Sequence, residues 1–97
     1  MATFLALINY TDQGIRNMRE SPGRLDAVKK AFQAAGGEVK AFYLAMGRYD
    51  AVCIAEAPDD ETAARLVLQI AGAGAVRTET LRVFGEAEYR KIIGALK

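Results

Sequence analysis

The chain has 97 residues and is 52% hydrophobic and 26% charged, which is the ordinary composition of a soluble globular protein and predicts one domain over residues 1–97. Its 13 Lys and Arg balance 12 Asp and Glu to a formal net charge of +1. This composition excludes intrinsic disorder. It also excludes electrostatic binding to nucleic acid, which needs several clustered cations on one face.

The residue types that are absent narrow the possible chemistry. The chain has no histidine, no tryptophan and a single cysteine. Histidine is the commonest metal ligand and general base, so imidazole metal sites and Ser-His-Asp triads are excluded. Cys53 lies in the apolar run Ala51–Ala55, where it is interpreted as a small core residue. We therefore expect no metal and no cofactor.

No targeting or membrane segment is predicted. The first residues, Met1–Phe4, lack the basic region and cleavage site of a signal peptide. The longest apolar stretch, Leu66–Val76, is far shorter than the roughly 18 to 20 residues that a membrane span needs. We expect a cytoplasmic protein.

The first third of the chain predicts a strand, a short helical turn and a helix. Thr3–Asn9 is an almost unbroken apolar run, which favours a strand covered on both faces. A helical turn is expected around Ile15 and Met18. Ser21 is predicted to cap the main helix, with Pro22 as its first residue. The buried side of this helix is marked by residues at helical spacing, Leu25, Val28 and Phe32. The two glycines Gly36 and Gly37 end the helix.

The middle of the chain predicts a hairpin. Glu38–Met46 and Asp50–Ala57 both favour strands, and only a tight turn fits between them. Strands joined so closely must be antiparallel, because a parallel return needs about a dozen connecting residues.

The last third predicts a helix, a strand and a terminal helix. After Pro58, the acidic run Asp59–Glu61 suits a helix N-terminus, although its oxygens can also bind a hard cation. A fourth strand is expected over Val76–Phe84. The buried side of the second helix is marked by Ala63, Leu66, Val67 and Ile70, and Gly72 and Gly74 end this helix. The apolar side of the terminal helix is marked by Tyr89, Ile92, Ile93 and Leu96.

This order of elements predicts an α+β fold of the ferredoxin-like βαββαβ type, with a four-stranded antiparallel sheet and an extra C-terminal helix. Two helices then cover one sheet face. In this plan the first and third strands are central, and they are the two apolar runs. The second and fourth strands are edges, and they carry the charges.

The opposite sheet face predicts self-association. In the first and third strands, the residues that point to either side of the sheet are apolar, so the face without helices is apolar as well. An exposed patch of that kind marks an interaction site. We expect a second copy of the chain to cover it, in a homodimer or a larger oligomer. The alternative is that the terminal helix folds back over this face.

Three segments together resemble the GYD domain family. They are the hairpin Gly47–Asp50, the end of the first strand Leu7–Thr11 and the segment Val76–Thr80 of the last strand. The resemblance extends over essentially the whole chain.

The family is named for Gly, Tyr and Asp, which correspond here to Gly47, Tyr49 and Asp50, with Arg48 inserted between them. The resemblance implies a ferredoxin-like fold similar to the dimeric α/β-barrel proteins, in small bacterial or archaeal proteins. It implies no known activity.

The hairpin residues Arg48, Tyr49 and Asp50 are candidates for holding a small organic or anionic ligand, since they combine a planar cation, a phenol and a carboxylate. Turn chemistry explains the same residues without a ligand, and we favour it. In that explanation Gly47 supplies a positive φ, Asp50 caps amides of the hairpin, and Tyr49 bonds to backbone.

Further ligand-binding candidates lie on the first and last strands. Alternation along Arg77–Thr80 places Arg77 and Glu79 on one face and two threonines on the other. The charges either line a cavity between two sheets or are solvated edge charges. Asn9 and Tyr10 end the first strand, where they either reach a pocket mouth or stop the pairing.

Two classes of function fit these observations. The leading prediction is a noncatalytic homo-oligomer that binds a small ligand or serves as an accessory or assembly subunit. The alternative is a cofactor-independent enzyme similar to the monooxygenases and isomerases of the dimeric α/β-barrel group, with Tyr49, Asp50, Arg77 and Glu79 as candidate acid, base and anchors. A cavity with a converging Tyr and carboxylate would favour the enzyme, and a filled core the binding role.

Overall fold

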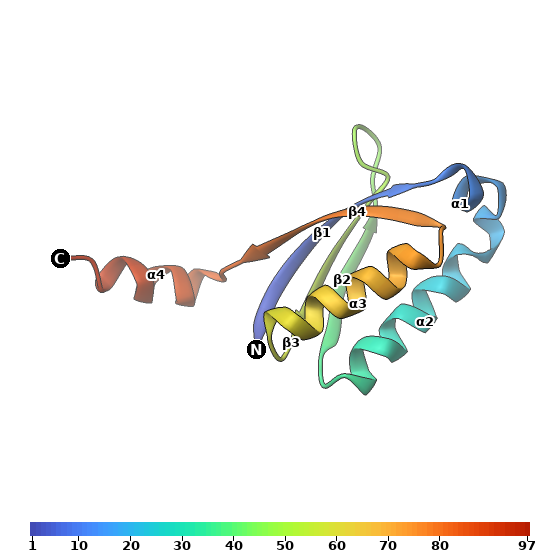
Figure 1. Cartoon of the computed structure of the whole chain (residues 1–97). Helices are drawn as coiled ribbons and strands as arrows, with labels where there is room; N and C mark the ends of the chain where they lie inside the picture. The colour runs from blue at the N-terminus through green and yellow to red at the C-terminus, as the bar shows by residue number, and fades with distance from the viewer.

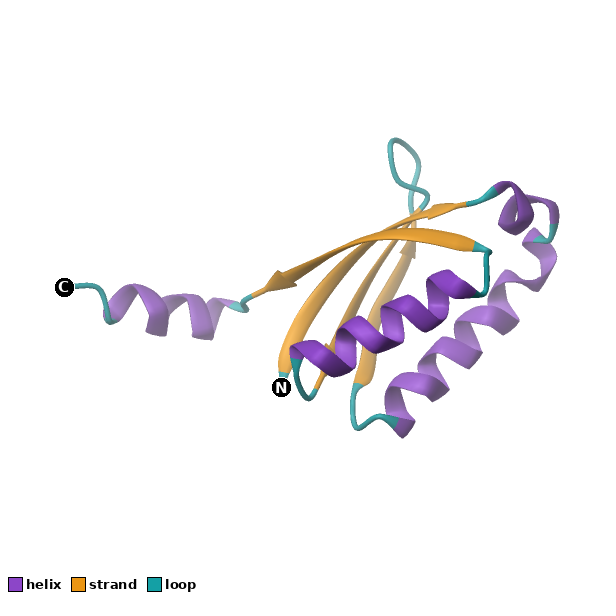
Figure 2. Ribbon diagram, in the orientation of Figure 1, coloured by secondary structure: helices purple, strands orange, loops and turns teal.

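The computed structural model describes residues 1–97 as one antiparallel sheet with helices (Figure 1). The strands lie in the order β2-β3-β1-β4. Helices α2 and α3 cover one sheet face, while α4 continues beyond the end of β4 (Figure 2). The predicted α+β ferredoxin-like fold is confirmed. The elements are β1 (Ala2–Tyr10), α1 (Asp12–Arg16), the 3-10 turn η1 (Met18–Glu20), α2 (Ser21–Ala34), β2 (Glu38–Leu44), β3 (Ala51–Ala57), α3 (Asp60–Gly72), β4 (Val76–Val83) and α4 (Glu86–Gly94).

The two central strands are the two apolar runs of the sequence, as predicted. β1 pairs antiparallel with β3 on one side and with β4 on the other. Directly opposite residues share a face, so Ala6 faces the helices together with Cys53. Its neighbour Leu5 points away from the helices together with Ile54.

The start of α2 differs from the prediction by one residue. Ser21 is the first residue of the helix, and Glu20, with helical φ and ψ, stands at the cap position without a side-chain hydrogen bond. The chain runs from η1 directly into α2, so the extended residue that a Ser cap requires is absent. The stop is as predicted, because Gly36 has a φ of +87°.

The hairpin between β2 and β3 is longer than predicted. β2 ends at Leu44, two residues before Met46, and the connection projects from the sheet as a loop (Figure 1). The backbone N–H of Ala45 donates to the carbonyl oxygen of Asp50 over 2.8 Å and closes this loop. Gly47 has a φ of +144°, which confirms its predicted role in the turn.

The acidic run before α3 serves as a helix start. Asp59 has extended backbone angles, and its Oδ1 accepts a hydrogen bond of 2.8 Å from the N–H of Thr62. No group of three or more acidic or cysteine side chains is arranged to hold a metal ion. Gly74, with a φ of +93°, ends the turn after α3.

The core lies between the sheet and the two main helices. Phe32 from α2, Ala55 from β3 and Leu66 from α3 pack together in its centre. The terminal helix takes no part in it. Because α4 extends away from the sheet, it does not fold back over the outer face, and that alternative is wrong for this chain (Figure 1). No helix combines the length and apolar character that crossing a membrane takes.

Candidate functional site

The outer face, meaning the sheet face away from α2 and α3, has an apolar centre. Leu5 and Leu7 of β1 stand opposite Ile54 and Val52 of β3. Leu81 of β4 extends this patch and is 42% exposed. The two main helices lie on the other side of the sheet, so they leave this patch uncovered (Figure 2).

Four of the predicted site residues meet in two pairs at one end of the outer face. Asn9 stands directly opposite Arg77 in the pairing of β1 with β4. The hydroxyl of Tyr49 lies 3.4 Å from Oε1 of Glu79, to which it donates a long hydrogen bond. Arg48 is exposed on the projecting loop and joins neither pair.

The roles expected for the hairpin in the structural explanation need correction. Asp50 does not cap the hairpin; its Oδ2 accepts a hydrogen bond of 3.0 Å from the backbone N–H of Tyr10, at the end of β1. The Tyr49 hydroxyl bonds to the Glu79 carboxylate rather than to backbone. Both differences arise because the loop lies against β1 and β4, which are distant in the sequence.

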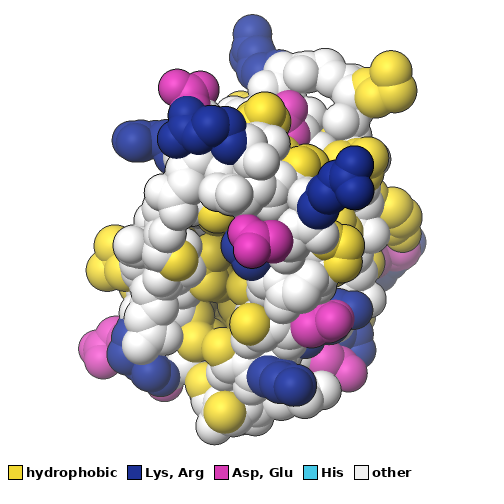
Figure 3. All heavy atoms as spheres, turned by 90° about the vertical axis from the view of Figure 1, so that its right-hand side faces the viewer, with side chains coloured by type: hydrophobic (Ala, Val, Ile, Leu, Met, Phe, Trp, Pro, Cys, Tyr) yellow, Lys and Arg dark blue, Asp and Glu magenta, His cyan; other side chains and the backbone are white.

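A second candidate site is a cavity of about 330 Å³ between the sheet and the helices α2 and α3. Of the 24 residues that line it, 19 are hydrophobic. Figure 3, which views the molecule from the right-hand side of Figure 1, shows hydrophobic side chains at the bottom of a hollow. The cavity is open on one side, so it is neither the enclosed enzyme pocket nor the filled core considered above.

The cavity exists because the middle of its floor is built from small side chains. Ala6, Cys53 and Ala55 occupy the helix-facing positions of the two central strands. Ala31 of α2 and Ala63 of α3 also line the space. Large residues at these positions would fill the gap between the layers, as close-packed interiors normally do.

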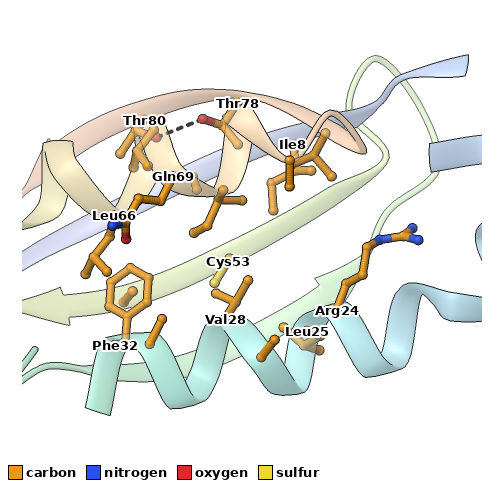
Figure 4. Close-up of a pocket in the computed structure, with 18 of the residues that line it drawn as sticks. Ile8, Arg24, Leu25, Val28, Phe32, Cys53, Leu66, Gln69, Thr78 and Thr80 are labelled. Carbon is orange, nitrogen blue, oxygen red and sulfur yellow. Dashed lines mark hydrogen bonds between the residues drawn. The ribbon is translucent and has the colours of Figure 1, made fainter. Parts of the chain in front are cut away.

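A few polar groups interrupt the apolar lining. Thr78 and Thr80 of β4 face the cavity, and their hydroxyls are 3.3 Å apart and hydrogen-bonded (Figure 4). The others are Tyr10, Ser21, Arg24 and Gln69.

Among the seven predicted site residues, only Tyr10 lines the cavity. Strand alternation separates Thr78 and Thr80 from Arg77 and Glu79, but it assigns the threonines neither to the helix side of the sheet nor to a ligand. Their signal was the presence of hydroxyls at helix-facing positions of a strand, where apolar residues are usual. Arg24 carried no signal, since a lone arginine in an amphipathic helix is ordinary.

The electrostatics of the cavity are simple. No Asp, Glu or Lys lines it, and Arg24 is the one charged residue in its wall. Burial raises the pKa of the Cys53 thiol above its ordinary value of 9.0, an effect that the positive charge of Lys29 partly offsets. Cys53 is therefore a protonated, weakly reactive thiol at neutral pH.

The fold and the hairpin agree with one family of known proteins. The family model described as GYD domain matches residues 4–93. This chain belongs to the GYD domain family. The matched range contains Gly47, Tyr49 and Asp50, the residues that carry the resemblance in the sequence.

Two comparisons each find a protein from Thermus thermophilus that is similar to this GYD domain protein. One relative is named glutamine synthetase and cystathionine beta-lyase binding protein; it is 36% identical over 89 residues, which cover 91% of this chain and 94% of the relative. The other match is a crystal structure with a TM-score of 0.55 and 29% identity, covering 88% of this chain and 95% of that one. The name of the first describes a protein that binds other proteins.

Proposed function

We propose that this GYD domain protein is an accessory protein that binds other proteins and pairs with a second copy of itself. The observation that carries the proposal is the apolar surface left uncovered on the outer face and on α4. Extensive exposed apolar patches mark interaction sites in soluble proteins. The name of the Thermus thermophilus relative supports the same role.

The outer face suits a second copy of the chain. Its apolar centre is continuous across three strands, because Leu5, Ile54 and Leu81 stand side by side in the sheet. Two such faces can pack as the inner faces of a two-sheet sandwich do, with their side chains interdigitated. A twofold axis would place the same patch on both sides of the interface, so the apolar patch of each copy would cover that of the other.

The terminal helix suits a partner of a different kind. Ile92 and Ile93 are each 47% exposed, and Tyr89 is 57% exposed. Leu96, predicted to lie on the apolar side of this helix, follows its end at Gly94 and is 72% exposed. A helix of this length is marginal in water unless it packs against something. Because α4 extends past the sheet, away from α2 and α3, we assign to it the contact with the partner protein (Figure 1).

Glutamine synthetase is the first partner to test, and cystathionine β-lyase the second, since the relative's name includes both. The purified chain should bind at least one of these purified enzymes from the same organism in biolayer interferometry. The double variant Ile92→Glu/Ile93→Glu should weaken the interaction at least tenfold, because each buried Ile contributes on the order of 2 kcal/mol.

The matched control is Lys29→Ala/Lys30→Ala, which changes the net charge by the same amount on exposed positions of α2. It should leave the affinity unchanged. Failure of the wild-type chain to bind either enzyme would contradict the assigned partners. Equal affinities of the two double variants would remove α4 from the interface.

We further propose that the cavity binds a small, mainly apolar molecule. Two observations support this proposal. The cavity volume of about 330 Å³ lies at the lower end of the range for small-ligand sites, and the lining is largely hydrophobic. The cofactor-independent enzyme is not proposed. Its candidate acid and base residues Asp50 and Glu79 lie outside the cavity, so no carboxylate faces the space where a substrate would lie.

A further inference from the structure

We propose that the ligand of this cavity is a small amphipathic carboxylate, such as an unbranched alkanoate or an aryl-alkanoate. Its carboxylate would lie at Arg24 and its apolar part would extend toward Phe32 (Figure 4). This inference rests on the proposed binding role of the cavity and specifies the chemical class of its ligand.

The one charged side chain of the lining lies at one end of the cavity. Arg24 and Phe32 mark opposite ends of the labelled lining in Figure 4. Phe32 follows Arg24 by eight positions, which correspond to about 12 Å along α2. Two hydroxyl residues belong to the Arg24 end by their position in the fold, Tyr10 as the last residue of β1 and Ser21 as the first of α2. The Phe32 end adjoins the apolar core.

The guanidinium of Arg24 is only partly satisfied within the chain. Its Nη1 donates to the carbonyl oxygen of Asn17 over 3.0 Å. Its Nη2 is shielded from solvent and has no hydrogen-bond partner. None of the ion pairs in the protein includes Arg24. An unpartnered donor on a charged group is costly to the folded protein, so a turn of the Arg24 side chain that brings this donor to an acceptor on the ligand would add to the affinity.

A carboxylate is the acceptor that fits this end best. The planar fork of arginine matches a carboxylate, and hydrogen bonds between two ionised groups are stronger than neutral ones. The N-terminus of α2 lies at the same end, and its dipole favours an anion. Because Arg24 is the one charged residue of the lining, a monoanion balances it better than a phosphate with its second charge.

The remaining lining determines the body of the ligand. Leu25, Val28 and Phe32 of α2 form one wall, and small residues form the floor. Thr78 and Thr80 already hydrogen-bond to each other, so they demand no further polar group from the ligand. An alkyl chain or a single aromatic ring of moderate length therefore fits this part of the space.

Calorimetric titration with decanoate and decanol tests the proposal, because the two probes share a chain and differ in the head group. Wild-type protein should bind decanoate about tenfold more tightly than decanol, as expected for a charge-assisted hydrogen bond. Arg24→Gln should lower the affinity for decanoate to that for decanol and so abolish this preference. Arg24→Lys should keep part of it, since the charge remains and the fork is lost.

Arg65→Gln on α3 is the matched control, because Arg65 is exposed and does not line the cavity. It should bind both probes as the wild type does. Decanoate should also slow the reaction of Cys53, the single cysteine, with a thiol reagent, which places the ligand in the cavity.

The outcomes separate the two proposals. Equal affinities for decanoate and decanol, or a decanoate preference that survives in Arg24→Gln, would overturn the carboxylate inference and leave the cavity role standing. Binding of decanoate without protection of Cys53 would place the ligand elsewhere and would also overturn it. Binding of neither probe to the wild-type chain would overturn the cavity role itself.

Discussion

Asp50 was selected from the sequence as a ligand-binding candidate, yet its carboxylate holds the end of β1. Its Oδ2 accepts from the N–H of Tyr10, 40 residues away in the sequence. Its own N–H donates to the carbonyl oxygen of Ile8 over 2.8 Å. This residue therefore joins the projecting loop to the central strand through both its side chain and its backbone.

Asp50→Ala should lower the free energy of unfolding by about 1–2 kcal/mol, because the partly buried Tyr10 N–H loses its charged acceptor. Urea denaturation measures the change. Asp26→Ala is the control, since it removes the same charge from α2, where the carboxylate makes no hydrogen bond or ion pair, and should change stability by less than about 0.5 kcal/mol. Equal stabilities of the two variants would contradict this role.

Asp59 makes part of the stability depend on pH. Hydrogen bonds from Thr62, through its side chain and then its backbone N–H, lower the pKa of the Asp59 carboxyl below its ordinary value of 3.8. Folding therefore favours the ionised form. The contribution is complete above about pH 4 and is lost as the pH falls through the folded pKa.

Asp59→Ala should accordingly be less stable than the wild type at pH 7, and the difference between them should shrink at pH 3. Asp59→Asn, which keeps a capping oxygen without a charge, should lose less stability at pH 7 than Asp59→Ala. Urea unfolding at the two pH values measures both effects. A difference that is the same at both pH values would refute the ionised cap.

At the scale of elements, close backbone contacts hold the helices against the sheet. Gly14 of α1 is buried, and a Cβ built on it would lie 2.1 Å from the carbonyl oxygen of Ala75. This contact fixes α1 against the start of β4. By contrast, a Cβ on Gly23 in the first turn of α2 would meet no atom within 4 Å.

Two substitutions of the same kind should therefore have opposite effects. Gly14→Ala should destabilise the protein by about 1–3 kcal/mol, because the backbone of Ala75 must move. Gly23→Ala should stabilise it by up to about 1 kcal/mol, because alanine favours the helix. Thermal and urea unfolding of both variants measure the effects, and a tolerated Gly14→Ala would contradict the close packing of α1 on β4.

Elements were well predicted where their signals are local. The strand runs, the Gly36 stop and the acidic start of α3 follow from short stretches of sequence. Two boundaries were predicted wrongly. Ser21 lies inside α2 rather than at its cap, because η1 runs directly into the helix. β2 ends at Leu44 rather than at Met46, because the contacts of the projecting loop decide where the strand ends. Neighbouring elements override local preference at such boundaries.

At the scale of the whole molecule, the proposed pairing of two copies through the outer face can be tested. If two copies pair through it, the melting temperature should rise with protein concentration, since association stabilises the folded chain by mass action. Leu7→Glu should remove this dependence and produce a monomer in light scattering, because it places a charge in the centre of the patch.

Leu68→Glu provides the comparison. Leu68 is 72% exposed on the solvent side of α3, so the same substitution there should leave the oligomeric state unchanged. A wild-type chain that stays monomeric at micromolar concentration would contradict pairing through the outer face.

The candidate site was predicted only in part, because its residues come together from distant segments. Tyr49 and Glu79 were both named from the sequence, but their contact depends on the path of the projecting loop over β4. Arg24 was not named. Its proposed role depends on an unpartnered nitrogen and on the place of the residue in the cavity wall, neither of which a local pattern reveals.

The sequence by itself determined the order of the elements, the two central strands and the apolar outer face, because strand and helix periodicities are local properties of the side chains. Only the tertiary structure decided that a cavity remains between the layers and that α4 lies apart from the sheet. A cavity depends on the distance between layers whose facing residues belong to different segments, so small side chains such as Ala6 and Ala55 leave a space only once those layers are assembled.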